Sequence, residues 1–456
     1  MKKIAFYTLG CKVNQVETEQ LKEEFIHRGY EIVDFTDEAD VYLINTCTVT
    51  HVSDRKSRAI IRRAARHPHA LVAVTGCMAQ VAAKELAGIE GIDLIVNNLD
   101  KENIADIIEE LDPEQERPVI IECSPDKARR LKPILYSRQH KRTRAFVKIQ
   151  DGCESWCSYC IVPRARGPVR SKLPEHVLQE IEQLLSLGYR EIVLTGIHTG
   201  FYGKDLDNWD LLRLLNKILT DSKGDYRIRL SSIEPLEVSQ ELIDLIGDNP
   251  TRMCRHFHIP LQSGSNRILK DMNRRYRREY YHDLLQGIAA RIPGVALTTD
   301  VMVGFPGEDE KDFQDTYDLI DSLPFMDLHV FPYSRRPGTR AASITPQVSP
   351  QEKQARSQKL LDLAERKHKD FISGQVGQEL TLLVEKQTGE HDYTGLSDNY
   401  IEVSFQSPYD VCGELIRVRV EGINAKRVEG IWNTGTQNPN KQQLFRIGWV
   451  NTGRSR

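Results

Sequence analysis

The chain has 456 residues, nine cysteines and a formal net charge of −3, with 62 Lys and Arg against 65 Asp and Glu. This length predicts two to four domains, and the near-neutral balance excludes a protein whose overall charge drives binding to nucleic acid. The sequence has no run of eighteen apolar residues and no signal-peptide core. We therefore expect a soluble, cytoplasmic protein without a membrane partner, in a compartment that keeps cysteines reduced.

Residues 1–100 alternate short apolar runs with helical patterns, which is typical of a parallel α/β domain. The expected strands are 3–9, 41–45, 70–75 and 92–96, and the expected helices are 15–28, 53–66 and 80–86.

Cys11, Cys47 and Cys77 each come just after one of these strands. Ligand sites of open parallel sheets lie at the carboxyl ends of the strands, so we expect the three thiols to meet in one crevice. Three thiolates can hold an iron–sulfur cluster. The alternative is three buried apolar thiols, which are common for free cysteine.

Residues 101–144 are charged and contain four prolines, which favours a linker between domains. Cys123 lies there without a partner at useful spacing, and we interpret it as incidental.

Cys153, Cys157 and Cys160 form a C-x3-C-x2-C loop after the linker. Three thiolates from one loop can bind an iron–sulfur cluster and leave one iron open to another ligand. A zinc site would need a second pair of ligands, and a disulfide would leave one thiol over. The spacing therefore favours a cluster.

Residues 145–348 alternate strands and helices, and six such units predict a partial (β/α)6 barrel. The expected strands are 146–149, 191–195, 227–231, 257–260, 296–303 and 327–331; the expected helices include 175–187 and 309–323. His256 and His258 fall on one of these strands, and we favour packing or RNA contact over metal binding for them.

The cysteine loop resembles the signature of radical S-adenosylmethionine (SAM) enzymes. The strings TLGCKVNQVETE, INTCTVT and VTGCMAQ resemble the N-terminal domain of the methylthiotransferases, a family of radical SAM enzymes with two clusters. The resemblance implies two [4Fe-4S] clusters, one on each cysteine triad. It also implies that the open iron at the second triad binds SAM, whose cleavage gives a 5′-deoxyadenosyl radical, and that Cys11, Cys47 and Cys77 are catalytic because their cluster carries the sulfur.

The resemblance also implies that residues at the ends of the barrel strands hold SAM. They are Gly196, Glu234, Gln262 and Asp300, and we add Tyr159, which can pack over a planar ligand. Each is also an ordinary residue for a turn between a strand and a helix.

After a proline-spaced stretch, residues 349–373 are typical of a connecting helix, and residues 374–456 of a small barrel that resembles the RNA-binding TRAM domain. The expected strands are 379–385, 392–395, 400–404 and 413–421, with more in the tail 430–450.

Three basic runs, at 55–66, 164–172 and 267–278, could form a rim for RNA phosphates, although such runs are usually solvated faces. By resemblance the substrate is the tRNA anticodon loop, where a methylthio group is added to C2 of N6-threonylcarbamoyladenosine at position 37. One SAM would donate the methyl group and a second the radical, with an electron from a donor such as flavodoxin or ferredoxin. The alternatives are isopentenyladenosine 37, an aspartate of a ribosomal protein, or a non-enzymatic iron–sulfur RNA-binding sensor.

Overall fold

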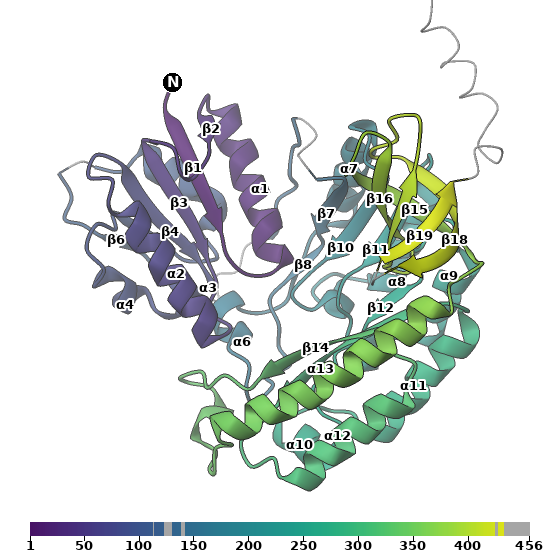
Figure 1. Cartoon of the computed structure of the whole chain (residues 1–456). Coiled ribbons are helices and arrows are strands. Elements are labelled where there is room, and N and C mark those ends of the chain that lie inside the picture. Colours follow the sequence, from purple (N-terminus) through teal and green to yellow (C-terminus); the bar gives the residue numbers. More distant parts are fainter. Residues whose placement is uncertain (113, 123–129, 138–141, 425–426, 433–456) are drawn as a thin grey trace, which may run out of the picture. The chain divides into compact units, whose positions relative to one another are not determined.

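The computed structural model describes residues 1–456 except 113, 123–129, 138–141, 425–426 and 433–456 (Figure 1). The chain divides into two units, Met1–His368 and Lys369–Arg456. Cys123 and the tail beyond Trp432 lie outside the described residues. Within the described part of the chain, none of the helices combines the length and the apolar character that crossing a membrane requires.

The first unit begins with a six-stranded parallel sheet in the order β2-β1-β3-β4-β5-β6. Its strands are β1 (Lys3–Thr8), β2 (Glu31–Val33), β3 (Val41–Thr46), β4 (Leu71–Gly76), β5 (Leu94–Val96) and β6 (Val119–Ile121). Its helices are α1 (Lys12–His27), α2 (His51–Ala64), α3 (Cys77–Val81), α4 (Ala83–Ala87), η1 (Lys101–Asn103) and α5 (Ile104–Glu109). All six residues of β3 are buried, because helices cover both faces of a parallel sheet.

Part of the segment that we interpreted as an irregular linker is ordered, which corrects that description. The helix α5 packs its apolar side into the core beside β1 and β5, and β6 pairs with β5 as an edge strand. The prolines that suggested a linker flank β6 rather than interrupt it. The domain boundaries themselves stay predictions.

The central part of the first unit contains six parallel strands in two groups, β11-β10-β7 and β12-β13-β14. Bridges from Ile228 to Met253 and from Ser232 to His258 join the groups into one curved wall. The strands are β7 (Arg144–Lys148), β10 (Glu191–Thr195), β11 (Arg227–Leu230), β12 (His256–His258), β13 (Ala296–Val303) and β14 (Asp327–Pro332). This arrangement confirms the partial barrel.

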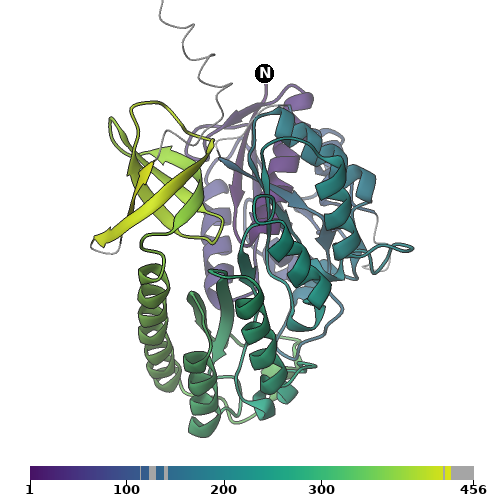
Figure 2. The ribbon, with the colours of Figure 1, turned by 90° about the vertical axis from the view of Figure 1, so that its right-hand side faces the viewer.

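Figure 2 shows helices in front of these central strands, on the outer side of the wall. They are α7 (Pro174–Ser186), α8 (Leu211–Asp221), α9 (Gln240–Asp248), α10 (Asn266–Asp271), α11 (Arg278–Arg291) and α12 (Glu310–Ser322), and α13 (Pro350–Ser373) follows β14. Their apolar faces and the strands share one large core. The inner side and the carboxyl ends of the strands are thereby left to polar residues and loops.

The second unit is a closed five-stranded barrel in the order β15-β16-β17-β19-β18. Its strands are β15 (Glu379–Gln387), β16 (Asp392–Ser397), β17 (Glu402–Gln406), β18 (Leu415–Asn424) and β19 (Arg427–Trp432). Alternate residues such as Leu382, Val384, Val418 and Val420 fill its interior, as the period of two requires. The α/β class with a small C-terminal β-barrel is therefore confirmed.

Candidate active site

The loop with Cys153, Cys157 and Cys160 connects the short strand β8 (Gln150–Asp151) to α6 (Val162–Arg166). Gly152 opens the loop with a φ of +76°, and any Cβ there would collide with the carbonyl of Pro168. The sharp entry therefore requires glycine. The three thiols lie close enough to alter one another's pKa, so the loop gathers the predicted ligands at one place.

The pKa values of the three thiols shift in different directions, because burial opposes every thiolate but the hydrogen bond and the charge of His198 lower the pKa of Cys153. Burial raises the pKa of Cys157, and it raises the pKa of Cys160 to about 12. Such thiols stay protonated at neutral pH unless a cation favours the thiolate, and iron supplies that charge. The donor set thus suits a cluster, while the ligand role of each cysteine remains a prediction.

His198 is a neighbour of this loop that the sequence did not reveal. Its Nδ1 lies 3.4 Å from the Sγ of Cys153, and its Nε2 lies 2.9 Å from a carboxylate oxygen of Glu237. The ring stacks on Phe201 with 3.6 Å between centroids. Burial opposes the charged ring, but the hydrogen bonds to Cys153 and Glu237 raise the pKa of His198 to about 9.

Glu234, one of the predicted SAM-binding residues, is paired with Arg274. The same guanidinium contacts the Sγ of Cys157 through Nη1 at 3.5 Å. Arg274 therefore links a strand end to the cysteine loop, although the sequence showed it only as part of a basic run. Its place is fixed because its Nη2 also donates to the carbonyl of Pro260.

Gly196 follows β10 and Gln262 follows β12, so both lie after the carboxyl ends of strands of the partial barrel. Gln262 adopts a positive φ of +66°, its backbone is held by Asp300 and Met302, and its side-chain Oε1 is buried without a hydrogen-bond partner among the described residues. A ligand with a donor group would satisfy that oxygen. A Cβ on Gly196 would meet Oε1 of Gln150 at 2.9 Å, so the close approach of these two residues favours glycine.

Tyr159 points into a small apolar cluster with Met272, Met302 and Phe305. Burial raises the pKa of Tyr159 well above its usual value, which keeps the phenol neutral. In this arrangement the ring packs against protein side chains, and its predicted contact with a planar ligand remains untested.

Asp300 lies within β13, between His258 at the end of β12 and His329 within β14. One of its carboxylate oxygens is 3.3 Å from Nε2 of His258 and 3.3 Å from Nδ1 of His329. The three ligand atoms lie within 4.8 Å of one another, a spacing at which they could hold a cation or polar groups of a substrate. The acidic partner of His258 therefore comes from the adjacent strand and not from its own sequence neighbourhood.

The N-terminal triad also gathers at one edge of its sheet. Cys11 is the residue before α1, Cys47 follows β3, and Cys77 is the first residue of α3. A Cβ added to Gly10 would approach Sγ of Cys47 at 3.2 Å, and the pKa of Cys47 responds to both Cys77 and Cys11. The three thiols therefore lie together at this edge, as the strand pattern predicts.

A buried ion network lies between the two triads. The side chain of Arg166 on α6 is 0% exposed, and it donates to Glu17 of α1 at 2.5 Å and to Asp151 of β8 at 3.3 Å. Lys101 and Lys148 also pair with Glu17, at 2.6 and 3.2 Å. Burial disfavours the charge of Arg166, but nearby thiols and carboxylates, with Cys77 first among them, raise its pKa well above its usual value.

The expected phosphate rim is wrong for its second run, and the other two runs remain mostly exposed. In the second basic run only Arg164 is exposed, because Arg166, Arg170 and Lys172 are buried in ion pairs with carboxylates. In the third run the side chain of Arg274 is buried as well, whereas Arg267, Lys270, Arg275 and Arg277 are exposed. The first run, on α2 and just after it, is exposed at Arg55, Lys56, Arg62, Arg63 and Arg66. Charge runs near a site can therefore face inward.

Comparisons with known proteins agree with this geometry. Residues 147–320 match the radical SAM superfamily, and residues 3–97 match the uncharacterized protein family UPF0004. A radical SAM methyltransferase, TsrM from Kitasatospora setae, shares the fold with a TM-score of 0.56 at 17% identity, over 75% of each chain.

Curated relatives match nearly the whole chain. The threonylcarbamoyladenosine tRNA methylthiotransferase MtaB of Bacillus subtilis is 42% identical, over 92% of this chain and 94% of its own length. The MtaB of Aquifex aeolicus is 40% identical over 92% and 100%. A tRNA-2-methylthio-N(6)-dimethylallyladenosine synthase of Natranaerobius thermophilus is 35% identical over 91% and 94%. With this identity over more than nine-tenths of its length, the chain belongs to the methylthiotransferase family of radical SAM enzymes.

Proposed function

We propose that this enzyme adds a methylthio group to C2 of N6-threonylcarbamoyladenosine at position 37 of tRNA. The observation that carries the proposal is the extent of identity to enzymes of that name, 42% and 40% over 92% of the chain. The dimethylallyladenosine enzyme of Natranaerobius thermophilus is less similar, at 35%. One SAM then serves as methyl donor and a second as radical source.

We infer that Cys11, Cys47 and Cys77 hold a second [4Fe-4S] cluster beside the one at Cys153, Cys157 and Cys160. Two observations support it. The three N-terminal thiols affect one another electrostatically, as ligands of one centre must. Nε of the neighbouring Arg166 is buried without a hydrogen-bond partner among the described residues, and a sulfur of a bound cluster is an acceptor for it.

The two clusters and SAM, when bound, supply one-electron cleavage of a carbon–sulfur bond and a transferable sulfur. The protein supplies position and a dry cavity. Arg274 holds Glu234 against the loop at Cys157, and Gln262 offers its free oxygen to the cofactor. Glu17, Arg166 and Asp151 hold the N-terminal sheet against the second loop, which keeps the two centres at a constant separation.

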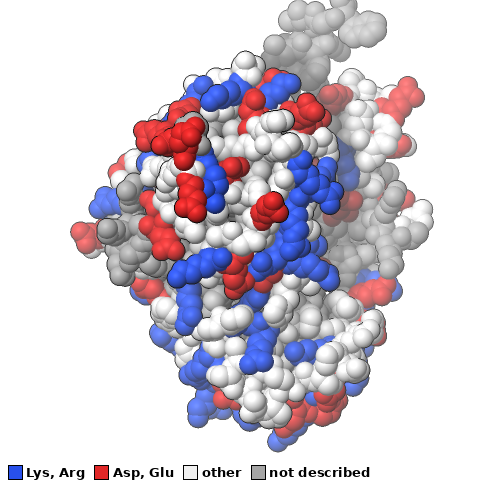
Figure 3. Space-filling model, turned by 90° about the vertical axis from the view of Figure 1, so that its left-hand side faces the viewer, with Lys and Arg blue, Asp and Glu red and all other residues white. Residues whose placement is uncertain are grey.

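We propose tRNA as the partner, read through its anticodon loop, where splayed bases can enter a pocket. The exposed arginines and lysine of α2 offer contacts for phosphates, and Figure 3 shows Lys and Arg side chains gathered in a band across one face of the molecule. The C-terminal barrel has the size and closure of small RNA-binding barrels. An electron donor of the flavodoxin or ferredoxin type completes the reaction.

The substrate is tested by mass spectrometry of tRNA nucleosides after reaction with the anaerobically reconstituted enzyme. We expect a methylthio mass shift on tRNA that carries threonylcarbamoyladenosine, and none on tRNA that carries isopentenyladenosine. A shift on the second tRNA alone would contradict the proposal. Cys11→Ala is the matched control, since it should retain SAM cleavage and give no shifted nucleoside.

A further inference from the structure

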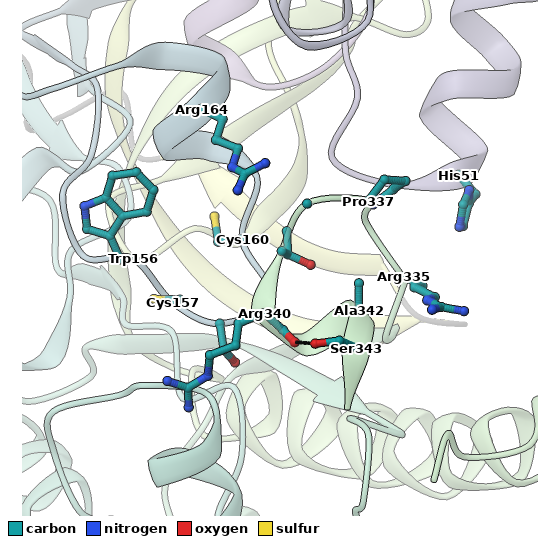
Figure 4. Close-up of a pocket in the computed structure, with 13 residues that line it drawn as sticks. His51, Trp156, Cys157, Cys160, Arg164, Arg335, Pro337, Arg340, Ala342 and Ser343 are labelled. Atoms are coloured by element: carbon teal, nitrogen blue, oxygen red, sulfur yellow. Dashed lines mark hydrogen bonds between the residues drawn. The ribbon is translucent and has the colours of Figure 1, made fainter. Parts of the chain in front are cut away.

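A cavity of about 830 Å³ opens beside the loop of the second cysteine triad (Figure 4). The thiols of two candidate ligands, Cys157 and Cys160, form part of its lining. The loop after β14 forms another part, so the cavity leads from the surface of the first unit to the predicted cluster. A molecule in this cavity would therefore lie against the cluster.

The lining is cationic. Arg164, Arg335 and Arg340 all contribute to it, and no Asp or Glu does. All three are exposed, and among the residues that the structure describes none of them makes an ion pair. Figure 4 shows Arg164 and Arg340 on opposite sides of Cys160. Three uncompensated guanidinium groups around one cavity favour an anionic occupant.

An exposed aromatic side chain stands at the edge of the same cavity. Trp156, inside the cysteine loop, is 60% exposed and has a φ of +51°, in the left-handed region. Asn273 fixes this backbone by donating to the carbonyl of Trp156 at 3.0 Å. A large apolar ring held out to solvent beside arginines is typical of the centre of a protein interface.

The residues that line the cavity also indicate which kind of molecule binds there. It includes none of Gly196, Glu234, Gln262 and Asp300, and none of the N-terminal thiols. A tRNA base that receives sulfur must reach those groups, whereas an electron carrier needs only to approach the cluster. The cavity therefore suits the carrier better than the RNA.

We propose that this cavity and its arginines form the docking surface for an acidic one-electron carrier protein, such as a reduced flavodoxin. The proposal rests on the proposed function, because that reaction consumes one electron for each SAM that is cleaved reductively. One electron leaves the carrier, which is oxidised by one electron, and enters the centre at Cys153, Cys157 and Cys160, which is reduced by one electron. No bond forms or breaks in this transfer, and such encounters need only a small interface.

The test compares two reductants with one set of variants. Arg335→Glu and Arg340→Glu are combined, and Lys223→Glu is the matched control, since Lys223 is an exposed cation just before β11, at the other end of the barrel strands. The rate of 5′-deoxyadenosine formation is measured with flavodoxin, its reductase and NADPH at low salt, and again with dithionite. The affinity for tRNA is measured in parallel.

We expect the double variant to lose at least about tenfold of the flavodoxin-driven rate, because electrostatic steering contributes 10- to 1,000-fold to such associations. Its dithionite-driven rate and its tRNA affinity should match those of the Lys223→Glu control. An unchanged flavodoxin-driven rate would overturn the proposal. An equal loss with both reductants, together with weaker tRNA binding, would overturn it in favour of an RNA surface. If the proposed function is wrong, the result is different: SAM is still cleaved with flavodoxin as the reductant, but no methylthio product forms.

Discussion

Replacement of Arg166 by methionine tests the buried network between the two triads. Methionine keeps much of the side-chain volume and removes the charge. Glu17 then retains Lys101 at 2.6 Å and Lys148 at 3.2 Å, and Asp151 retains Arg170 at 3.0 Å. Removal of one partner of a buried ion pair costs about 3–5 kcal/mol. Because both carboxylates keep other cations, we expect the lower end, a loss of about 3 kcal/mol.

The assay is urea unfolding of the cluster-free protein, with the transition of the first unit followed for Arg166→Met, Glu17→Gln and the double variant. The double variant should be more stable than the sum of the single losses predicts, by about 1–3 kcal/mol, because Arg166 and Glu17 are direct partners and each single change already removes their interaction. Arg62→Met, at an exposed arginine of α2, is the control and should change stability by less than about 0.5 kcal/mol. A loss below about 1 kcal/mol for Arg166→Met, or strict additivity, would refute the reasoning.

Three further predictions concern single residues. Cys157→Ala should abolish SAM cleavage and lower bound iron by about half, because one three-cysteine loop then lacks a ligand. If the variant still cleaves SAM, this loop does not hold the cluster that reacts with SAM. Cys47→Ala should retain SAM cleavage and lose the methylthio product, and product formation would exclude a sulfur-bearing role for the N-terminal triad. Burial opposes the charge of Glu191, but Arg229 and Arg227 lower its pKa from 4.5 to about 2. Its contribution to stability, about 3 kcal/mol, should be present above pH 4.5 and lost as the pH falls toward 2. Glu191→Gln should remove this part of the pH dependence of the urea midpoint, and an unchanged profile would count against it.

Much of the fold could be predicted from local pattern. The strands at 191–195 and 296–303 have the predicted bounds, because apolar runs bounded by turn residues define buried parallel strands well. The cysteines after β3 and β4 could be placed together because parallel strands end at one edge. The strand β6 was missed, since three residues between prolines and charges give too short an apolar run to recognise.

The partners of buried charges could not be predicted. Arg166 lies 149 positions from Glu17 in sequence, and Arg274 lies 40 from Glu234, so nothing local marks them as inward-facing. Basic runs usually face solvent, but several of these side chains are buried because tertiary packing brings carboxylates next to them. His258 is similar, because its acidic neighbour Asp300 comes from the adjacent strand. The role of each SAM-binding candidate remains a prediction.

The side chain of Arg166 also restricts how the first unit can move. If the N-terminal sheet and the partial barrel moved apart about a hinge, the guanidinium of Arg166 would lose Glu17 or Asp151. A buried charge without a partner costs several kcal/mol. Opening of the two halves like a clamshell is therefore strongly disfavoured. A substrate of this unit therefore has to bind within one fixed arrangement of the N-terminal sheet and the partial barrel.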